Sequence, residues 1–571
     1  MPPAPKQYIP RGPASVEVYM DDPISPTFVR AEDLTRRCRS IGVTTDPTNA
    51  AAVRTLLTAI NTRLGVLGGG NVSLGAGTYP VSSIVALTNA GRWRGIPGKT
   101  IVKASGALAT QVFSLSGNVE LVDIDIDGNQ QTSFGVVVAG NNVTLDRVTA
   151  HHTTIDSFLI GAESADYSNI KLRNCIAHHS GYVADSPTNE ASGFEIYRGA
   201  NAVVLEGCEA YEFTDNGIDI HDHIGENSPY NISVLHPYIH NPAASGGDGI
   251  GIAVYSGKTA THGDVHDVDI IAPKIVACKQ AFQIGAQRCD IIGGIVDGYT
   301  TQLGTFYNYA RSKISHLKCS DGGASALGIR ELDATNLIEI ERCSFNNLNA
   351  YAIRLTSPGA RVIGCDFSNV SASATLGTVM FDATADNAII DGNVFSDIAT
   401  YDLYSSAIVD GVTISRNHLA ATTLLLAGYP ANFRNAIVFG NYGIVGSGEI
   451  RTHSGSIAAL TENAFNSIDN PFGKAVRLLS LDIYVSTKAT STEPNIDCGI
   501  GSSAEADYTT LFDDLPGETV GFYRSTIASP GAQTVPQLWE SGSGNRYLNM
   551  SIKGAAATGM VATYVAIVMG L

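Results

Sequence analysis

The sequence predicts an all-β protein: a right-handed parallel β-helix with an N-terminal capping helix and a C-terminal β-sandwich (jelly-roll-like) domain. Short alternating apolar stretches recur along most of the chain, spaced 22 to 36 residues apart. Gly, Asn and Asp separate these stretches, and helical periodicity is confined to one early segment. Self-similarity at a period of about 20–50 residues indicates a solenoid, and short alternating strands favour a β-solenoid over helical repeats.

One sequence pattern, apolar-x-apolar-x-x-X, locates the repeats. It fits at thirteen positions from Val119 to Ala436, which predicts about thirteen coils. Its sixth residue is often Cys or Asn, at Cys175, Cys208, Cys319, Cys343, Cys365, Asn393, Asn417 and Asn441. Neighbouring parallel strands lie about 4.8 Å apart, so equivalent inward side chains stack as ladders. We therefore expect a buried cysteine ladder followed by a hydrogen-bonded asparagine ladder.

Composition limits the possible partners and compartments. A chain of 571 residues exceeds one ordinary core, and a solenoid accounts for this length together with 59 glycines and 16% charged residues. The formal charge of −18 argues against nucleic acid or an anionic membrane surface as a partner. Nine cysteines without a CxxC pair predict reduced core thiols. No signal-peptide pattern is present, and the apolar run at Val561–Leu571 is too short to cross a bilayer.

The N-terminal region divides into an arm and a capping helix. Residues 1–40 are proline-rich and without a strong period, which predicts a flexible arm or a short docking segment. In residues 41–65, Asp46-Pro47 is expected to cap a helix that protects the open end of the first coil. Its apolar positions are Val53, Leu56, Leu57, Ile60 and Leu64. Gly68-Gly69-Gly70 lacks the following Lys-Ser/Thr of a phosphate loop, so it predicts a tight β turn.

Two stretches near the N-terminus carry a family resemblance. GVTTDPTNAAAVRTLLTAI followed by GGGNVSLGAGTYPVSS resembles the first helix and first coil of the pectate-lyase-like right-handed parallel β-helix superfamily, in particular of bacteriophage tailspikes. The likeness covers residues 41–83 in motif and extends to about Gly446 in periodicity. It implies the fold and leaves the reaction open, because the superfamily contains lyases, hydrolases and epimerases.

The period stops near Gly446, so the β-helix is expected over residues 66–445 and a second domain over 446–571. Residues 476–485, 516–523 and 546–552 alternate as sandwich strands do, and the chain closes on ATYVAIVMGL. The tailspike resemblance implies that this domain holds three chains together. A carbohydrate-binding module is the alternative.

The candidate site falls where the coils are longest. Spacings of 27, 33, 29 and 36 residues between Val143 and Val268 indicate inserted loops, which gather on one binding face of a solenoid. The strands GFEIY, GIDIH and GIGIAVY align at Gly193, Gly217 and Gly249, so period-two alternation predicts two outward rows. The rows are Glu195–Asp219–Gly251 and Tyr197–His221–Ala253. The small residues Gly251 and Ala253 would leave space beside the acids and the rings for a sugar ring. The bordering residues are Arg198, Asp222, His223, Tyr255, Lys258 and His262.

Two reactions fit this patch. In β-elimination on a uronic-acid polymer, His221 or Tyr197 removes a proton and a cation such as Arg198 or Lys258 stabilises the developing charge. In hydrolysis, Glu195 and Asp219 act as the paired carboxylates. We expect elimination slightly ahead of hydrolysis, because Tyr, His and Arg converge on one patch.

GIDIHD also resembles the GFDPHE motif of alginate C5-epimerases. Asp219, His221 and Asp222 match its acid, histidine and final acid, whereas the epimerase tyrosine three residues before the Asp is Asn216 here. Tyr197 on the adjacent coil would have to supply that ring. No cofactor is predicted, with a structural or site cation such as calcium left open.

The tailspike resemblance implies a depolymerase that cleaves a bacterial surface polysaccharide, such as O-antigen, capsule or exopolysaccharide. It further implies a homotrimer, attachment to a phage tail or baseplate through the N-terminal arm, and a place in the virion tail, acting outside the host cell. A non-catalytic polysaccharide-binding adhesin on the same scaffold is the alternative from a different class. Neither nucleic-acid binding nor membrane insertion is expected.

Overall fold

The computed structural model describes most of the chain from residue 49 to residue 570. The described ranges are 49–106, 110–161, 166–183, 186–187, 191–222, 228–243, 247–256, 265–307, 311–323, 326–332, 337–370, 377–398, 401–405, 407–419, 426–427, 432–434, 436–439, 441–443, 450–457, 465–469, 476–487, 495–501, 512–516, 521–526, 538–539, 547–553 and 561–570. The predicted arm at 1–40 and the Asp46-Pro47 cap lie outside these residues. The chain divides into two compact units, residues 1–339 and 340–571, which we describe in turn.

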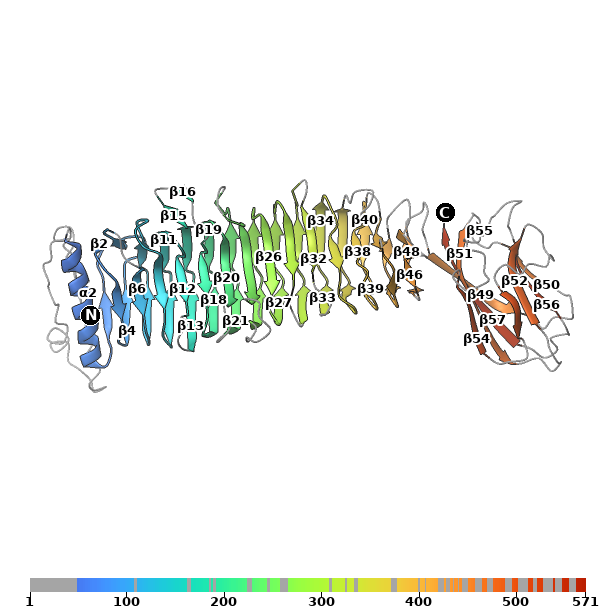
Figure 1. Ribbon diagram of the computed structural model, residues 1–571, viewed down its shortest axis with the longest axis horizontal. Helices are drawn as coiled ribbons and strands as arrows, with labels where there is room; N and C mark the ends of the chain where they lie inside the picture. Colours follow the sequence, from blue (N-terminus) through green and yellow to red (C-terminus); the bar gives the residue numbers. More distant parts are fainter. Residues whose placement is uncertain are drawn as a thin grey trace, which may run out of the picture. The chain divides into compact units, whose positions relative to one another are not determined.

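The first unit begins with helix α2 (Ala50–Leu67), which packs on strands β2 (Gly77–Val81) and β3 (Val85–Leu87) at the N-terminal end of the stack (Figure 1). Its N-cap is Asn49, whose side chain accepts a hydrogen bond from Ala52 N at 3.1 Å. The five apolar positions predicted for this helix are all buried. Gly68 ends the helix in the left-handed conformation, and the three glycines at 68–70 all have positive φ, as the turn into strand β1 (Asn71–Ser73) requires.

Three parallel sheets form the rest of the first unit, and each coil contributes one strand to each sheet (Figure 1). The first sheet contains β1 (Asn71–Ser73), β4 (Gly91–Arg94), β7 (Val119–Val122), β10 (Val143–Asp146), β13 (Tyr167–Arg173), β18 (Ala200–Glu206), β21 (Tyr230–Leu235), β24 (His266–Ile271), β27 (Arg288–Ile292) and β30 (Arg311–Ser315). The second contains β2 (Gly77–Val81), β5 (Thr100–Ala104), β8 (Asp125–Asp127), β11 (Thr149–Thr153), β14 (Ile176–Ser180), β19 (Glu209–Phe213), β22 (Tyr238–His240), β25 (Lys274–Val276), β28 (Ile295–Asp297) and β31 (Lys318–Ser320). The third contains β3 (Val85–Leu87), β6 (Gln111–Leu115), β9 (Phe134–Val138), β12 (Phe158–Ile160), β17 (Phe194–Ile196), β20 (Asn216–Asp222), β23 (Ile250–Ser256), β26 (Gln280–Gly285), β29 (Gln302–Phe306) and β32 (Leu327–Glu331). A short antiparallel hairpin of β15 (Tyr182–Val183) and β16 (Ser186–Pro187) is inserted between β14 and β17. Strand β33 (Leu337–Glu341) contains the boundary between the two units.

The second unit also contains parallel coils. Its strands are β36 (Arg361–Ile363), β39 (Ile389–Asp391), β43 (Thr413–Ser415) and β47 (Ile437–Phe439) in one sheet, β34 (Ser344–Leu348), β37 (Asp366–Val370), β40 (Val394–Ser396), β44 (His418–Leu419) and β48 (Tyr442–Gly443) in the next, and β35 (Ile353–Leu355), β38 (Val379–Phe381), β41 (Leu403–Ser405) and β45 (Leu426–Ala427) in the third. β42 (Val409–Asp410) pairs with β46 (Phe433–Arg434).

Antiparallel strands follow the coils of the second unit and form two sheets. The first joins β49 (Ile450–Ile457), β57 (Val561–Gly570), β51 (Val476–Thr487) and β54 (Gly521–Thr526), with β55 (Leu538–Trp539) paired to β51. The second joins β50 (Phe465–Asp469), β56 (Tyr547–Lys553), β52 (Asn495–Gly501) and β53 (Phe512–Pro516). The stretch 516–523, predicted as one strand, instead holds the end of β53 and the start of β54. Trimerisation and carbohydrate binding stay predictions for this region.

The interior ladders agree with most of the repeat pattern. Asn393 donates to Asn417 Oδ1 and Asn417 donates to Asn441 Oδ1, each at 2.9 Å, and all three are buried. Cys175 and Cys208 are buried, and the seven cysteines whose side chains are described are all free. These features confirm the asparagine ladder and the reduced core thiols.

The repeat pattern is wrong in two respects. It begins at Val119 and therefore misses β1 and β4, which pair with each other and with β7. It also slips between β24 and β27, where Cys289 rather than Asp290 lies opposite Val268. A second one-residue slip follows between β27 and β30, where Lys313 rather than Ile314 lies opposite Asp290. Cys319 therefore lies opposite Val296 and is not part of the predicted ladder.

Candidate functional site

Four adjacent strands of the third sheet carry the candidate site: β12, β17, β20 and β23. A stack of glycines precedes it, and a Cβ atom on Gly193 would lie 2.8 Å from Gly217 O, while one on Gly217 would lie 2.7 Å from Gly251 O. The coils can approach this closely only without side chains at these positions. The register then places Glu195 beside Asp219, as the sequence predicted.

The predicted alignment of the third coil is wrong by two residues. Asp219 lies opposite Ala253, and His221 lies opposite Tyr255, so Gly251 is not in the row of the acids. The cause is the second glycine in GIGIAVY. Gly249 has a φ of 61° and belongs to the turn, and Gly251 occupies the close-packed position that Gly193 and Gly217 occupy in their coils. The Tyr255 side chain therefore lies beside His221, where the sequence analysis expected a small residue and space for a sugar ring.

A buried acid pair lies at one end of the site. Asp156, just before β12, is 4% exposed and accepts a hydrogen bond from Ser192 N at 2.6 Å. Its carboxyl is hydrogen-bonded to that of Glu195. Burial and the neighbouring acids Asp156 and Asp219 raise the pKa of Glu195 well above its usual range, and burial also raises the pKa of Asp156. The two carboxyls therefore share a proton at neutral pH.

Asp219 and His221 form the centre of the site, and each is 4% exposed. His221 Nδ1 lies 3.0 Å from Asp219 Oδ2, and His221 Nε2 lies 3.5 Å from Glu195 Oε1. Asn216 Nδ2 donates to Asp219 Oδ2 at 3.2 Å. Asp219 Oδ1 is buried, and among the described residues none is hydrogen-bonded to it. Burial lowers the pKa of His221, but the adjacent Asp219 outweighs it and the pKa is raised overall.

Tyrosine rings enclose His221 from both neighbouring coils. The Tyr197 ring lies edge-on to His221 with centroids 5.2 Å apart, and the Tyr255 ring stacks parallel to it at 5.1 Å. The Tyr255 hydroxyl donates towards Asp219 Oδ2 at 3.5 Å. Burial and the nearby carboxylates, Asp219 first, raise the pKa of Tyr255, so this hydroxyl stays protonated. Tyr197 and Tyr255 are half-buried and border the site on the outside.

The remaining predicted residues have different surroundings. Arg198 lies over the Tyr197 ring at 5.2 Å, and its Nε lies 3.3 Å from Asp222 Oδ1. Asp222 is fully buried and accepts a hydrogen bond from Ser228 Oγ at 2.7 Å, so it holds Arg198 in place instead of bordering the patch. His223, Lys258 and His262 lie outside the described residues.

The structure thus brings together Glu195, Tyr197, Asp219 and His221, as expected, and adds two residues that the sequence analysis missed. Asp156 sits 39 positions before Glu195 in a coil without a GxDxH pattern, and only the stacking of coils places it next to the site. Asn216, noted only as a departure from the epimerase motif, is a hydrogen-bond donor to Asp219. The site is also more deeply buried than the outward rows predicted.

Comparison with known proteins supports the fold. Residues 112–281 match a family model described as a right handed beta helix region, and this span includes the strands of the candidate site. The match and the parallel sheets confirm the predicted right-handed parallel β-helix. No curated protein matches the chain. No described helix is long and apolar enough to cross a membrane.

Solved structures similar to this chain share little sequence with it. The mannuronan C-5 epimerase AlgE6 A-module of Azotobacter vinelandii is 16% identical, over 68% of this chain and 94% of that chain, with a TM-score of 0.39. The catalytic domain of a GH87 alpha-1,3-glucanase in complex with nigerose is 14% identical, over 70% of both chains, with a TM-score of 0.43. A mutant tailspike protein of E. coli bacteriophage HK620 is 12% identical, over 97% of both chains, with a TM-score of 0.49. Likeness at this level carries no information about the reaction.

Proposed function

We propose that this protein is a polysaccharide depolymerase that cleaves a bacterial surface polysaccharide by glycoside hydrolysis. The observation that carries the proposal is the group of three adjacent carboxyl groups on consecutive coils, with Glu195 hydrogen-bonded to Asp156 and opposite Asp219. Glycoside hydrolysis requires one protonated and one ionised carboxyl on either side of the scissile bond. Glu195 is the general acid in this proposal, and Asp219 is the nucleophile.

The environment of each carboxyl fits its role. Burial, together with the neighbouring Asp156 and Asp219, raises the pKa of Glu195 and keeps a proton on it at neutral pH, when an exposed glutamic acid would have lost it. Asp219 Oδ2 lies within reach of three polar groups, His221 Nδ1, Asn216 Nδ2 and the Tyr255 hydroxyl, which hold this carboxyl in place.

In the first step, Asp219 attacks the anomeric carbon as the glycosidic C–O bond breaks and the Glu195 proton passes to the leaving oxygen. In the second, the Glu195 carboxylate takes a proton from water, whose oxygen displaces Asp219 and regenerates both groups. Strand neighbours lie about 4.8 Å apart, close to the separation of about 5–5.5 Å in retaining enzymes, so we expect retention of configuration.

β-Elimination is the second candidate, and the observation that favours it is the contact of the Tyr197 ring with both Arg198 and His221. It needs a neutral base, and the raised pKa of His221 favours the imidazolium instead. Tyr197 would have to be the base. We therefore place hydrolysis ahead of elimination.

The wider setting is proposed from the resemblance of residues 41–83 to tailspikes. We place the protein in a virion tail, as a homotrimer joined through residues 446–571 and attached through its N-terminal arm, acting outside the host cell.

The test is incubation of the full chain with a panel of bacterial envelope polysaccharides. New reducing ends without an unsaturated, ultraviolet-absorbing product would support hydrolysis. Glu195→Gln and Asp219→Asn are each expected to lower the rate by about 10²–10⁴-fold. Asp146→Asn, on β10 of the first sheet, is the control for loss of one negative charge and is expected to leave the rate unchanged.

An unsaturated product would instead establish elimination. Polysaccharide binding without any shortening of the polymer would identify an adhesin and refute the enzymatic proposal.

A further inference from the structure

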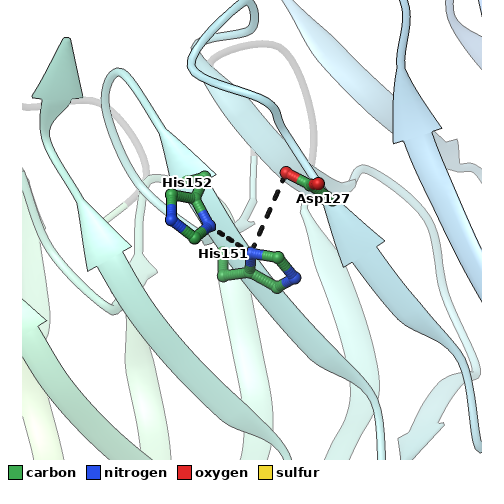
Figure 2. Close-up of side chains that lie close together, drawn as sticks. All are labelled: Asp127, His151 and His152. Carbon is green, nitrogen blue, oxygen red and sulfur yellow. Dashed lines mark hydrogen bonds and ion pairs between the residues drawn. The ribbon is translucent and has the colours of Figure 1, made fainter. Parts of the chain in front are cut away.

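A second cluster of chemically active side chains lies on the second sheet, away from the candidate site. Asp127 on β8 lies opposite His151 on β11, and His151 in turn lies opposite His178 on β14. Figure 2 shows Asp127, His151 and His152 turned towards one another on adjacent coils. The function proposed above uses none of these residues.

The backbone explains why two consecutive histidines share one side of the strand. Side chains of consecutive residues normally point to opposite faces of a sheet. His152 has a φ of 52°, in the left-handed region, which breaks the alternation and returns its ring to the side of His151. A left-handed non-glycine residue is costly, and Asn or Asp accepts that conformation more readily.

The ligand atoms of the cluster converge. His151 Nδ1 lies 2.5 Å from His152 Nδ1 and 3.9 Å from Asp127 Oδ1 (Figure 2). Within the part of the chain that the structure describes, these three residues are the one group of three or more His, Cys, Asp or Glu whose ligand atoms all lie within 4.8 Å of one another. The side chains of His151 and Asp127 are 13% and 14% exposed, which leaves a path for a small ion.

The surrounding contacts orient these atoms. Asp125 Oδ1 lies 2.9 Å from His151 Nε2, and the Nδ1 atom of the same ring faces the cluster. A carboxylate behind a histidine is the usual outer partner of a metal-binding imidazole. Asp127 accepts from Asn129 N at 2.7 Å and pairs with Lys103 Nζ at 2.7 Å, which fixes its carboxylate beside the histidines.

We propose that Asp127, His151 and His152 bind one divalent transition-metal cation of the Zn²⁺ type. Two imidazole nitrogens and one carboxylate oxygen are a donor set that Zn²⁺, Cu²⁺ and Ni²⁺ accept, with a fourth position left for water. Bonds of about 2.0–2.1 Å would hold the two nitrogens roughly 3.3 Å apart, which a small rotation of the His152 ring provides.

The next coil contains a matched pair that lacks the third ligand. His178 Nδ1 and His179 Nδ1 lie 2.7 Å apart, His179 has a φ of 53°, and Glu212 lies 2.7 Å from His179 Nε2. The His178 ring stacks on His151, with the ring centroids 4.6 Å apart.

The experiment titrates ZnCl₂ into the metal-free full chain by calorimetry. The wild type is expected to bind one Zn²⁺ per chain saturably, and His152→Asn to bind at least about tenfold more weakly. His179→Asn, the equivalent change one coil away, is expected to bind as the wild type does. Asparagine keeps the left-handed backbone at both positions, and circular dichroism checks that both variants fold.

A spectroscopic measurement tests the same site without a variant. Cu²⁺ bound to the wild type should show electron paramagnetic resonance coupling to two nitrogens. No saturable Zn²⁺ site in the wild type, or equal affinity in wild type and His152→Asn, would overturn the proposal. Equal loss in both variants would also overturn it, because binding would then not depend on the Asp127 group.

Discussion

The proton shared by Asp156 and Glu195 gives the sharpest prediction, and Asp156→Asn is the change that tests it. The amide keeps the acceptor for Ser192 N but removes a negative charge, and its NH₂ group donates to the Glu195 carboxylate. Both effects stabilise ionised Glu195, so its pKa falls. We therefore expect the variant to release the shared proton at a lower pH than the wild type does.

The magnitude follows from proton linkage. The raised pKa means that the folded chain keeps a proton that an unfolded chain loses above about pH 4.5. The stabilisation of the folded chain by this extra proton is fully present below about pH 4.5, and it is lost as the pH rises towards the pKa of Glu195 in the folded chain. One extra bound proton changes the free energy of unfolding by about 1.4 kcal/mol per pH unit, or about 2.7 kcal/mol between pH 5 and pH 7. Between pH 5 and pH 7, the free energy of unfolding of Asp156→Asn should therefore fall by less than that of the wild type, with a difference of up to about 2.7 kcal/mol.

Two measurements on the full chain check the prediction. Infrared spectra in D₂O should show a protonated carboxyl band at pH 7 in the wild type that weakens in Asp156→Asn. The midpoint of thermal unfolding should fall less between pH 5 and pH 7 in the variant than in the wild type. Asp146→Asn, which removes a carboxylate paired with Arg147, should retain the wild-type pH dependence.

An identical infrared band and an identical pH dependence in wild type and Asp156→Asn would refute the shared proton. Glu195 would then lose its assignment as the acid. Both readouts are independent of the substrate, so they stand even if no polysaccharide is cleaved.

Two further predictions concern stability. Phe194→Ala removes a fully buried ring stacked on Phe158 at 4.8 Å, and we expect the free energy of unfolding to fall by about 3–5 kcal/mol, with Phe194→Leu much milder in the same denaturation assay. Asn417→Ala breaks the buried asparagine ladder. Ile390 O then loses the Asn417 Nδ2 donor, and Asn393 Nδ2 loses the Asn417 Oδ1 acceptor. We expect a loss of about 2–6 kcal/mol, from roughly 1–3 kcal/mol for each of the two groups, whereas a loss below about 0.5 kcal/mol would show that the ladder is not stabilising.

The parts predicted correctly from sequence depend on patterns that repeat locally. Helical spacing located the buried face of α2, and period-two alternation with a recurring glycine placed Glu195 beside Asp219. The Asn393–Asn417–Asn441 ladder followed from one spacing of 24 residues, repeated. In each case the signal lies within one coil or in the identity of equivalent residues in adjacent coils.

The errors arose where the register depends on backbone conformation. GIGIAVY contains two glycines, and only the left-handed φ of Gly249 shows that Gly251 is the one that packs against Gly217. A side-chain pattern cannot distinguish turn glycines from packed ones, because neither carries a side chain.

The sequence by itself determined the solenoid and the pairing of one acid with another, since both follow from periodicity and strand alternation. Only the tertiary structure decided which groups share a proton and how deeply they are buried. Asp156 reaches Glu195 through the stacking of one coil on the next, across an inserted hairpin whose length no repeat pattern specifies. The desolvation that raises the pKa of Glu195 depends on all the atoms packed around it, which a linear pattern does not record.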